Sequence, residues 1–309
     1  MEKDYNAENQ HAESSADSAV KRTRRPFPEW YDYLVLAVLF IVSQMIFGAV
    51  LAACGSFAPS ESVQLTEPHA AAEAWAHGDA VTGSGSAARN TALGYMAGMA
   101  AMIVMTLIYR RLRGGHHGRI ARFSPRGFDP SLLLGGFIVI LAANIVLEPL
   151  VELLPGTPDY EKMLGLGGWA LLSTVVCAPV FEEFIFRGII LESTRHRFGV
   201  IAAWLISSLC FGLAHILPSQ IVATSVIGLI LGYVYIRSGS LFSGIVLHAL
   251  NNALAMLLLI LGYGDKSFAD LTGPRAYWPV YGVAALIFVW WAVRACRTLL
   301  RIRRTEKNG

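Results

Sequence analysis

Three ionisable side chains lie in one apolar stretch of the sequence, Phe181 to Gly188, which reads F-E-E-F-I-F-R-G. Glu183 and Arg187 are four residues apart with the acidic residue first, which favours an ion pair on one helix face. Glu182 lies about 100° further round the helix, at ~3.6 residues per turn, so its carboxylate faces another neighbour. Burial raises the pKa of a carboxylate, and a nearby arginine lowers it. Together the two effects can hold the pKa near the value that a general base needs at neutral pH. The alternative is a structural salt-bridge cluster between two helices.

Two later apolar stretches carry imidazole and amide groups at the same helical spacing. Phe211 and His215 are four residues apart in F-G-L-A-H, and His248 and Asn252 are four apart in H-A-L-N-N. Taken alone, each pair is explained by hydrogen bonds to a neighbouring membrane helix. Together with Glu182, they provide a base that activates water and donors that stabilise an oxyanion. These are the groups that amide hydrolysis requires.

A metal-assisted form of this chemistry is a second possibility. Glu182, His215 and His248 could complete a three-ligand Zn²⁺ site with a fourth position open for water. In the metal-independent form, Glu182 is the base while His248 and Asn252 are the oxyanion donors. The sequence leaves both forms open.

The elements that must position these residues are membrane helices. Of the 309 residues, 54% are hydrophobic and only 15% are charged, a composition typical of a polytopic membrane protein. The sequence therefore predicts an all-α fold. Eight apolar runs, each near the ~20 residues that a bilayer requires, predict transmembrane helices at about 31–53, 91–109, 131–153, 169–190, 200–217, 219–237, 241–262 and 277–294.

The distribution of basic residues predicts that both termini are cytoplasmic. With the N-terminus inside, 20 of the 25 Lys and Arg residues fall in cytoplasmic segments, as the positive-inside rule expects. The remaining five are Arg89, Lys162, Lys266 and Arg275 outside and Arg187 within a span. The basic C-terminal tail fits a cytoplasmic flank on anionic lipid, and no nucleic-acid partner is expected.

The predicted spans divide the chain into four parts. Residues 1–29 form a disordered cytoplasmic tail, and residues 30–168 hold three helices with a flexible outer loop at 54–90. Residues 169–262 form a core of four helices, and residues 263–309 hold the last helix and the basic tail. An alternative interpretation of Leu51 to Cys54 is a lipoprotein-type cleavage site before Cys54. The preceding apolar run is, however, longer than that of a signal peptide.

The three motifs occur in one order on successive helices, and in this they resemble the CPBP family of intramembrane proteases. That family includes the CAAX prenyl endopeptidases and bacterial Abi-type proteins, and the resemblance covers roughly residues 169–262. It implies an all-helical catalytic core around a cavity. It also implies that Glu182 activates water, that Glu183 and Arg187 support it, and that the site is completed by His215, His248 and Asn252.

The predicted function is therefore that of a multi-pass endopeptidase in a bacterial cytoplasmic membrane. Its expected substrates are membrane-anchored peptides or proteins, such as bacteriocin or signalling-peptide precursors, because prenylated substrates are not expected in most bacteria. The competing hypothesis is a non-enzymatic immunity or scaffold protein, or a transporter, that uses the same polar cluster.

Overall fold

A computed structural model describes residues 27–53, 85–114, 120, 123–155, 168–215, 217–264 and 266–308. Across these ranges the regular secondary structure is helical, with no β-strand, so the predicted all-α fold is confirmed for the described part of the chain. Cys54 and residues 1–26 lie outside it. The predicted outer loop 54–90 is shorter than expected, because a helix already begins at Gly85.

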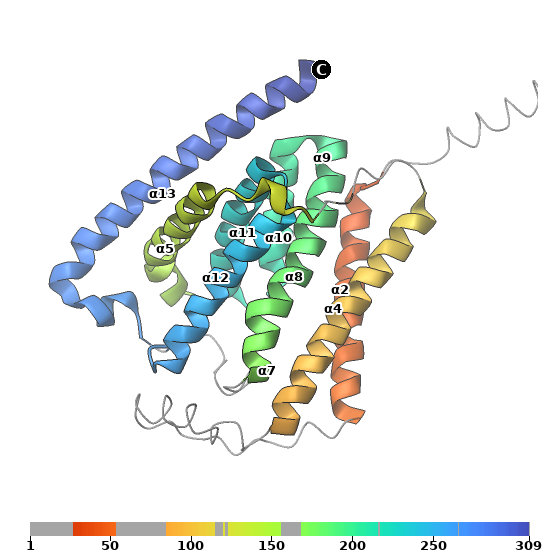
Figure 1. Ribbon diagram of the computed structural model, residues 1–309, viewed down its shortest axis with the longest axis horizontal. Coiled ribbons are helices and arrows are strands. Elements are labelled where there is room, and N and C mark those ends of the chain that lie inside the picture. The colour runs from red at the N-terminus through yellow and green to blue at the C-terminus, as the bar shows by residue number, and fades with distance from the viewer. Residues whose placement is uncertain are drawn as a thin grey trace, which may run out of the picture.

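Figure 1 shows how the helices of the described ranges are arranged. Their bounds are α2 (Trp30–Ala53), α4 (Gly85–Arg113), α5 (Pro130–Glu152), α7 (Gly168–Leu171), η3 (Leu172–Cys177), α8 (Ala178–Glu183), η4 (Phe184–Leu191), α9 (Glu192–Phe198), α10 (Val200–Leu213), α11 (Pro218–Ser238), α12 (Leu241–Ile260) and α13 (Phe268–Asn308). The segments η3 and η4 are π-helical, and together with α7, α8 and α9 they form one continuous run.

Six of these helices are long and apolar enough to cross a membrane, namely Trp30–Val50, Arg89–Arg113, Pro130–Glu152, Pro218–Ser238, Leu241–Ile260 and Phe268–Glu306. The fourth predicted span is the run from α7 to α9, in which π-helical turns interrupt the α-helix. The fifth predicted span ends at Leu213 rather than at residue 217. A multi-pass membrane fold is therefore confirmed, with six of the eight predicted helices at full membrane length.

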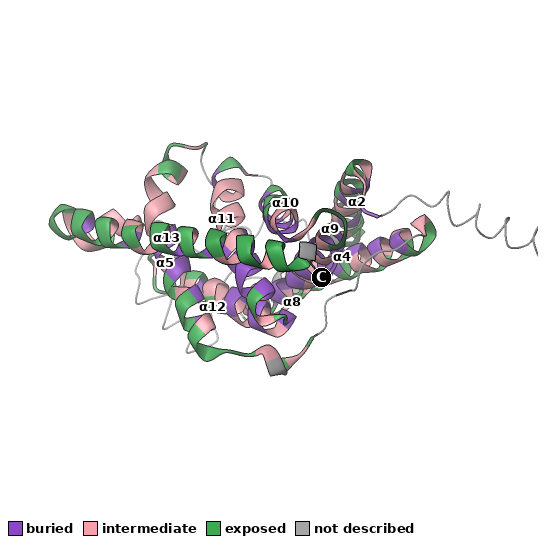
Figure 2. Ribbon diagram, turned by 90° about the horizontal axis from the view of Figure 1, so that it is seen from above, coloured by how far each residue is buried: buried purple, intermediate pink, exposed green. Residues whose placement is uncertain are grey.

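The run from α7 to α9 lies between two groups of helices (Figure 1). On one side, α2 and α4 pack as a pair, and α4 contacts α7, η3 and α8. On the other side, α12 contacts η3 and α8, while α5 packs against α11 and α13. Buried residues gather where α8, α11 and α12 meet, whereas α13 is mostly exposed along its length (Figure 2). The exposed side chains of α13 include large apolar residues such as Leu286 and Val289, which would contact lipid in a membrane.

Two glycines bring α10 and α11 unusually close together. A Cβ atom at Gly228 would lie 3.1 Å from the Cα of Ser208, and one at Gly212 would lie 2.7 Å from the backbone oxygen of Ile221. Small residues at such crossings allow backbones to approach within membrane helix pairs. The close crossing carries the backbone of Gly228 toward the fourth helical run.

The start of α2 is fastened to α4 by a buried carboxylate. Asp32 is fully buried and accepts hydrogen bonds from Nε of Arg113 at 2.9 Å and from the hydroxyl of Tyr109. Phe27 is only 1% exposed and packs edge-on against Tyr109. The C-terminal boundary predicted for the disordered tail, residue 29, is therefore too late, because Phe27 is already packed against α4.

The beginning of α5 follows directly from its sequence. Asp129 is the N-cap residue, and its side chain accepts from the backbone N–H groups of Ser131 and Leu132, while Pro130 occupies the first helical position. The hydrogen bond from the Ser131 hydroxyl, together with those backbone bonds, holds the pKa of Asp129 below its ordinary value. This cap fixes where the third predicted span begins.

Candidate active site

The fourth helical run is irregular beside the predicted base, and the irregularity has a local cause. The backbone N–H of Ala178 bonds to the carbonyl of Ser173, five residues earlier, which is the π-helical pattern. Five positions after Thr174 the residue is Pro179, which has no N–H. The Thr174 carbonyl is thus left without a helical donor, and Nδ2 of Asn252 donates to it at 2.9 Å.

Glu183 and Arg187 form the predicted ion pair on one helix face. Arg187 Nη1 lies 3.0 Å from Glu183 Oε1, and both side chains are fully buried. The contact has ion-pair distance but not hydrogen-bond geometry, so these two atoms find no hydrogen-bond partner among the described residues. Arg187 Nη2 donates to the carbonyl of Gly228 at 3.0 Å, and the guanidinium lies 4.6 Å from the ring centroid of Phe211. The pair therefore ties the fourth run to α10 and α11.

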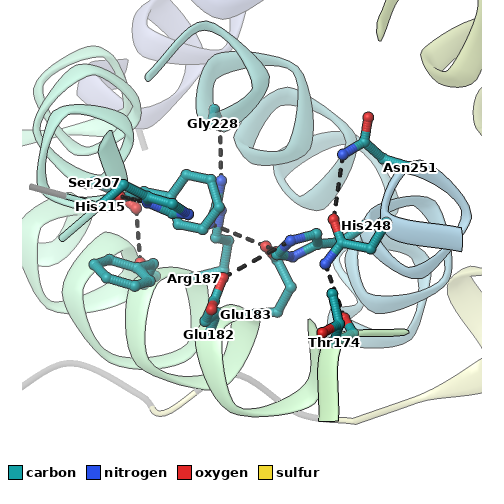
Figure 3. A network of polar contacts seen from close by, with 12 residues as sticks. Thr174, Glu182, Glu183, Arg187, Ser207, His215, Gly228, His248 and Asn251 are labelled. Carbon is teal, nitrogen blue, oxygen red and sulfur yellow. Dashed lines mark hydrogen bonds and ion pairs between the residues drawn. The ribbon is translucent and has the colours of Figure 1, made fainter. Parts of the chain in front are cut away.

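His248 lies between the two neighbouring carboxylates. Its Nε2 is 3.8 Å from Oε2 of Glu182, and its Nδ1 is 3.5 Å from Oε1 of Glu183. Figure 3 shows these side chains turned toward one another, with Arg187 beside them. Space for Glu183 depends on Gly244, because a Cβ atom there would lie 2.7 Å from Glu183 Oε2. The structure thus brings together Glu182, Glu183, Arg187 and His248, of which helical spacing alone predicted the pairing of Glu183 with Arg187.

Glu182 differs from Glu183 in exposure and in its partners. The Glu182 side chain is 16% exposed, whereas that of Glu183 is fully buried. Oε1 of Glu182 accepts a hydrogen bond from the hydroxyl of Tyr95, at 3.0 Å. Sequence reasoning missed Tyr95, which lies on α4. A tyrosine amid apolar residues does signal a hydroxyl in need of a partner, but the sequence carries no spacing rule that pairs Tyr95 with Glu182.

His215 lies just beyond the end of α10 and joins the cluster through an aromatic ring. Its Nδ1 is 2.9 Å from the backbone oxygen of Phe211, four residues earlier. The Phe211 ring packs edge-on against His215 and His248, with centroid distances of 5.2 Å and 5.5 Å. The four-residue spacing of Phe211 and His215 thus brings their rings into edge-on contact, and the same Phe211 ring also contacts His248.

Asn252 faces the fourth helical run one turn after His248. One N–H of its side-chain amide donates to the backbone carbonyl of Thr174, and its Oδ1 accepts a hydrogen bond from Nδ2 of Asn251 at 3.2 Å. Its two partners in these bonds, Asn251 and Thr174, are labelled in Figure 3. An amide nitrogen has two hydrogens, so Asn252 retains a second donor.

The proposed zinc ligands do not form a ligand set in this arrangement. Within the described ranges, no three His, Cys, Asp or Glu side chains are grouped so that they could hold a metal ion. Phe211 lies in ring contact with both histidines, and Oε1 of Glu182 is occupied by Tyr95. The donors present do not fit a bound Zn²⁺, and the zinc alternative stays a prediction.

Comparison with known proteins shows that the segment holding this cluster is similar to a protease family. Residues 165–254 match the family model described as type II CAAX prenyl endopeptidase Rce1-like. All six predicted site residues, from Glu182 to Asn252, fall within the matched segment. Searches of curated proteins and of solved structures returned no match. Residues 165–254 therefore resemble an Rce1-like domain, and this likeness supports a relation to the CPBP/CAAX proteases for that part of the chain.

Proposed function

We propose that this protein is an intramembrane endopeptidase in which Glu182 activates water. The observation that carries the proposal is the difference between the two adjacent glutamates. Glu183 is fully buried beside Arg187, whereas Glu182 is partly exposed and lies 3.8 Å from His248 Nε2. A base that must meet water and substrate needs the second environment.

In the proposed reaction, a water molecule lies between Glu182 Oε2 and His248 Nε2. Glu182 takes one proton from the water as its oxygen attacks the carbonyl carbon of the peptide bond. An N–H of His248 and the second amide N–H of Asn252 donate to the oxyanion that forms. The carbon–nitrogen bond then breaks, and Glu182 passes the proton to the leaving amine.

The other predicted residues support these groups. The carboxylate of Glu183 lies 3.5 Å from Nδ1 of His248 and so orients the ring, and Arg187 balances the charge of Glu183. His215, which packs on Phe211, is the remaining donor proposed for the substrate carbonyl. No step of this reaction requires a metal.

The proposed substrates are membrane-anchored peptides or proteins, reached from the lipid bilayer. The family description names CAAX prenyl endopeptidases, so a prenylated peptide is one test substrate. Bacteriocin or signalling-peptide precursors are the natural class that we propose, with the protein in a bacterial cytoplasmic membrane and both termini in the cytoplasm.

The test compares new peptide N-termini in membranes from cells that express the wild type or Glu182→Gln at matched levels. Glutamine keeps the size of the side chain but cannot act as the base, so the wild-type termini should be absent from the variant. Glu192→Gln is the matched control, because Glu192 lies on the same helical run and accepts its hydrogen bond from Tyr235.

The outcomes separate an enzyme from a structural protein. Termini that are present with the wild type and Glu192→Gln, but absent with Glu182→Gln, support proteolysis and identify the substrate. Identical sets from all three strains contradict the proposal and favour the immunity, scaffold or transporter hypothesis.

Gly244→Ala should impair the same activity without replacing a charged residue. The added Cβ would lie 2.7 Å from Glu183 Oε2, so the buried carboxylate must leave its present position beside His248. Glu183 orients His248, and a misplacement of about 1 Å near the reacting groups can cost a large factor in rate. We therefore expect the rate of cleavage to fall by roughly 10-fold to 100-fold. Gly135→Ala on α5 is the control, because nothing lies within 4 Å of its Cβ position. Equal cleavage rates for the two variants would show that the position of Glu183 is unimportant.

A further inference from the structure

Tyr95 contacts the proposed base from outside the matched domain. Its hydroxyl donates to Oε1 of Glu182 at 3.0 Å, across from α4 to α8. The family match begins at residue 165, so Tyr95 belongs to none of the motifs in that segment. The N-terminal helices therefore contribute directly to the site.

The position of Tyr95 is fixed by packing on both sides of α4. The adjacent residue, Met96, places its sulfur 3.3 Å from Sγ of Cys177 on the fourth helical run. On its other side, α4 packs closely against α2, because a Cβ at Gly98 would lie 3.3 Å from the backbone oxygen of Ser43. The hydroxyl of Tyr95 is thus held at Glu182 by helix packing.

This hydrogen bond makes the two oxygens of Glu182 unequal. Oε1 is engaged by Tyr95, while Oε2 lies 3.8 Å from His248 Nε2, which is too long for a direct hydrogen bond. A water molecule about 2.8 Å from both atoms would be held at an angle of roughly 85°. The arrangement leaves Oε2 as the oxygen that meets water.

We propose that Tyr95 is a positioning residue for this reaction. It holds Oε1 of Glu182 and thereby presents Oε2 to the attacking water beside His248. The inference rests on the proposed function, since it assigns a task to the oxygen that acts as base. The proposal also explains why the α2–α4 pair is docked against the fourth helical run at the level of Glu182.

The test uses Tyr95→Phe in the full-length protein, purified in detergent, with two measurements. The first is the rate at which N,N′-dicyclohexylcarbodiimide, which reacts with protonated carboxyl groups in apolar surroundings, labels Glu182, followed by mass spectrometry. A hydrogen bond to an ionised group stabilises that form, so its loss should raise the labelling rate at least about threefold. Glu182→Gln identifies the labelled position.

The second measurement is turnover of a lipid-anchored synthetic peptide that carries the sequence cleaved by the wild type. We expect kcat to fall roughly 10-fold in Tyr95→Phe, because the base loses its orientation, while KM stays within about twofold. A change in KM alone would instead assign Tyr95 to substrate binding and would overturn the proposal.

Two controls separate positioning from packing. Tyr235→Phe removes the same kind of bond at another glutamate, because Tyr235 donates to Oε1 of Glu192 at 2.7 Å. Met96→Leu alters the contact of α4 with Cys177 but not the bond to Glu182. Neither control should change the labelling of Glu182 or the value of kcat.

The labelling rate tests the hydrogen bond from Tyr95 to Glu182 whether or not the protein is a protease. Unchanged labelling in Tyr95→Phe overturns the inference even if the protein is a protease. Faster labelling supports the contact between Tyr95 and Glu182, and if the wild type then cleaves no peptide, it is the proposed function that fails.

Discussion

Replacing Arg187 by methionine is expected to lower the stability of the folded protein by about 3–5 kcal/mol. The substitution leaves Glu183 fully buried without a counter-charge, and it also removes the donor to the Gly228 carbonyl. An uncompensated buried charge is among the costliest defects that a single substitution can create. The effect should appear as a lower thermal midpoint in detergent and as less protein in the membrane.

Two further variants show whether the charge itself is responsible. In the double variant Glu183→Gln and Arg187→Met, no unpaired charge remains, so much of the lost stability should return. Arg195→Met is the surface control, because Arg195 pairs with Glu306 where both side chains are 31% exposed, and its loss should cost at most about 1 kcal/mol. If Arg187→Met were as stable as Arg195→Met, the buried pair would not hold these helices together.

His248→Gln is expected to abolish most proteolysis while the protein remains folded. His248 is the side chain that contacts both carboxylates, at 3.8 Å from Glu182 and 3.5 Å from Glu183. Its loss removes the N–H proposed for the oxyanion and the partner that aligns the water, so the cleavage rate should fall by roughly 10²–10⁴-fold. The measurement is the initial rate of cleavage of the lipid-anchored peptide at equal protein concentration.

His196→Gln is the matched control for that experiment. His196 is an exposed residue on α9, and its replacement should leave the cleavage rate unchanged. Retention of more than about a tenth of the wild-type rate by His248→Gln would remove His248 from the proposed catalytic groups.

The sequence predicted those contacts that follow from helical spacing. The pairing of Glu183 with Arg187 and the contact of Phe211 with His215 each join residues four apart, and both are present. The placement of the apolar runs was also predictable, because bilayer thickness fixes the length of a spanning helix.

The sequence could not predict contacts that depend on how helices pack. Tyr95 reaches Glu182 across 87 residues, and only the docking of α4 beside α8 brings them together. The bond from Asn252 to Thr174 depends on the π-helical turn near Pro179, which hydrophobic periodicity does not reveal. The early end of α10 was missed because apolar residues continue past Leu213 into the connection.

The shortness of α10 has a consequence for the surrounding lipid. With 14 residues, α10 is roughly 21 Å long at ~1.5 Å per residue, whereas the hydrocarbon core of a bilayer is ~30 Å thick. Its exposed face carries Leu205, Leu209 and Leu213, which lie one above the next on successive turns. Thinning of the adjacent bilayer is one way in which such a hydrophobic mismatch is relieved. We therefore expect headgroups and water to lie closer to His215, at the end of α10, so that bilayer thickness helps to set the depth of the site below the membrane surface.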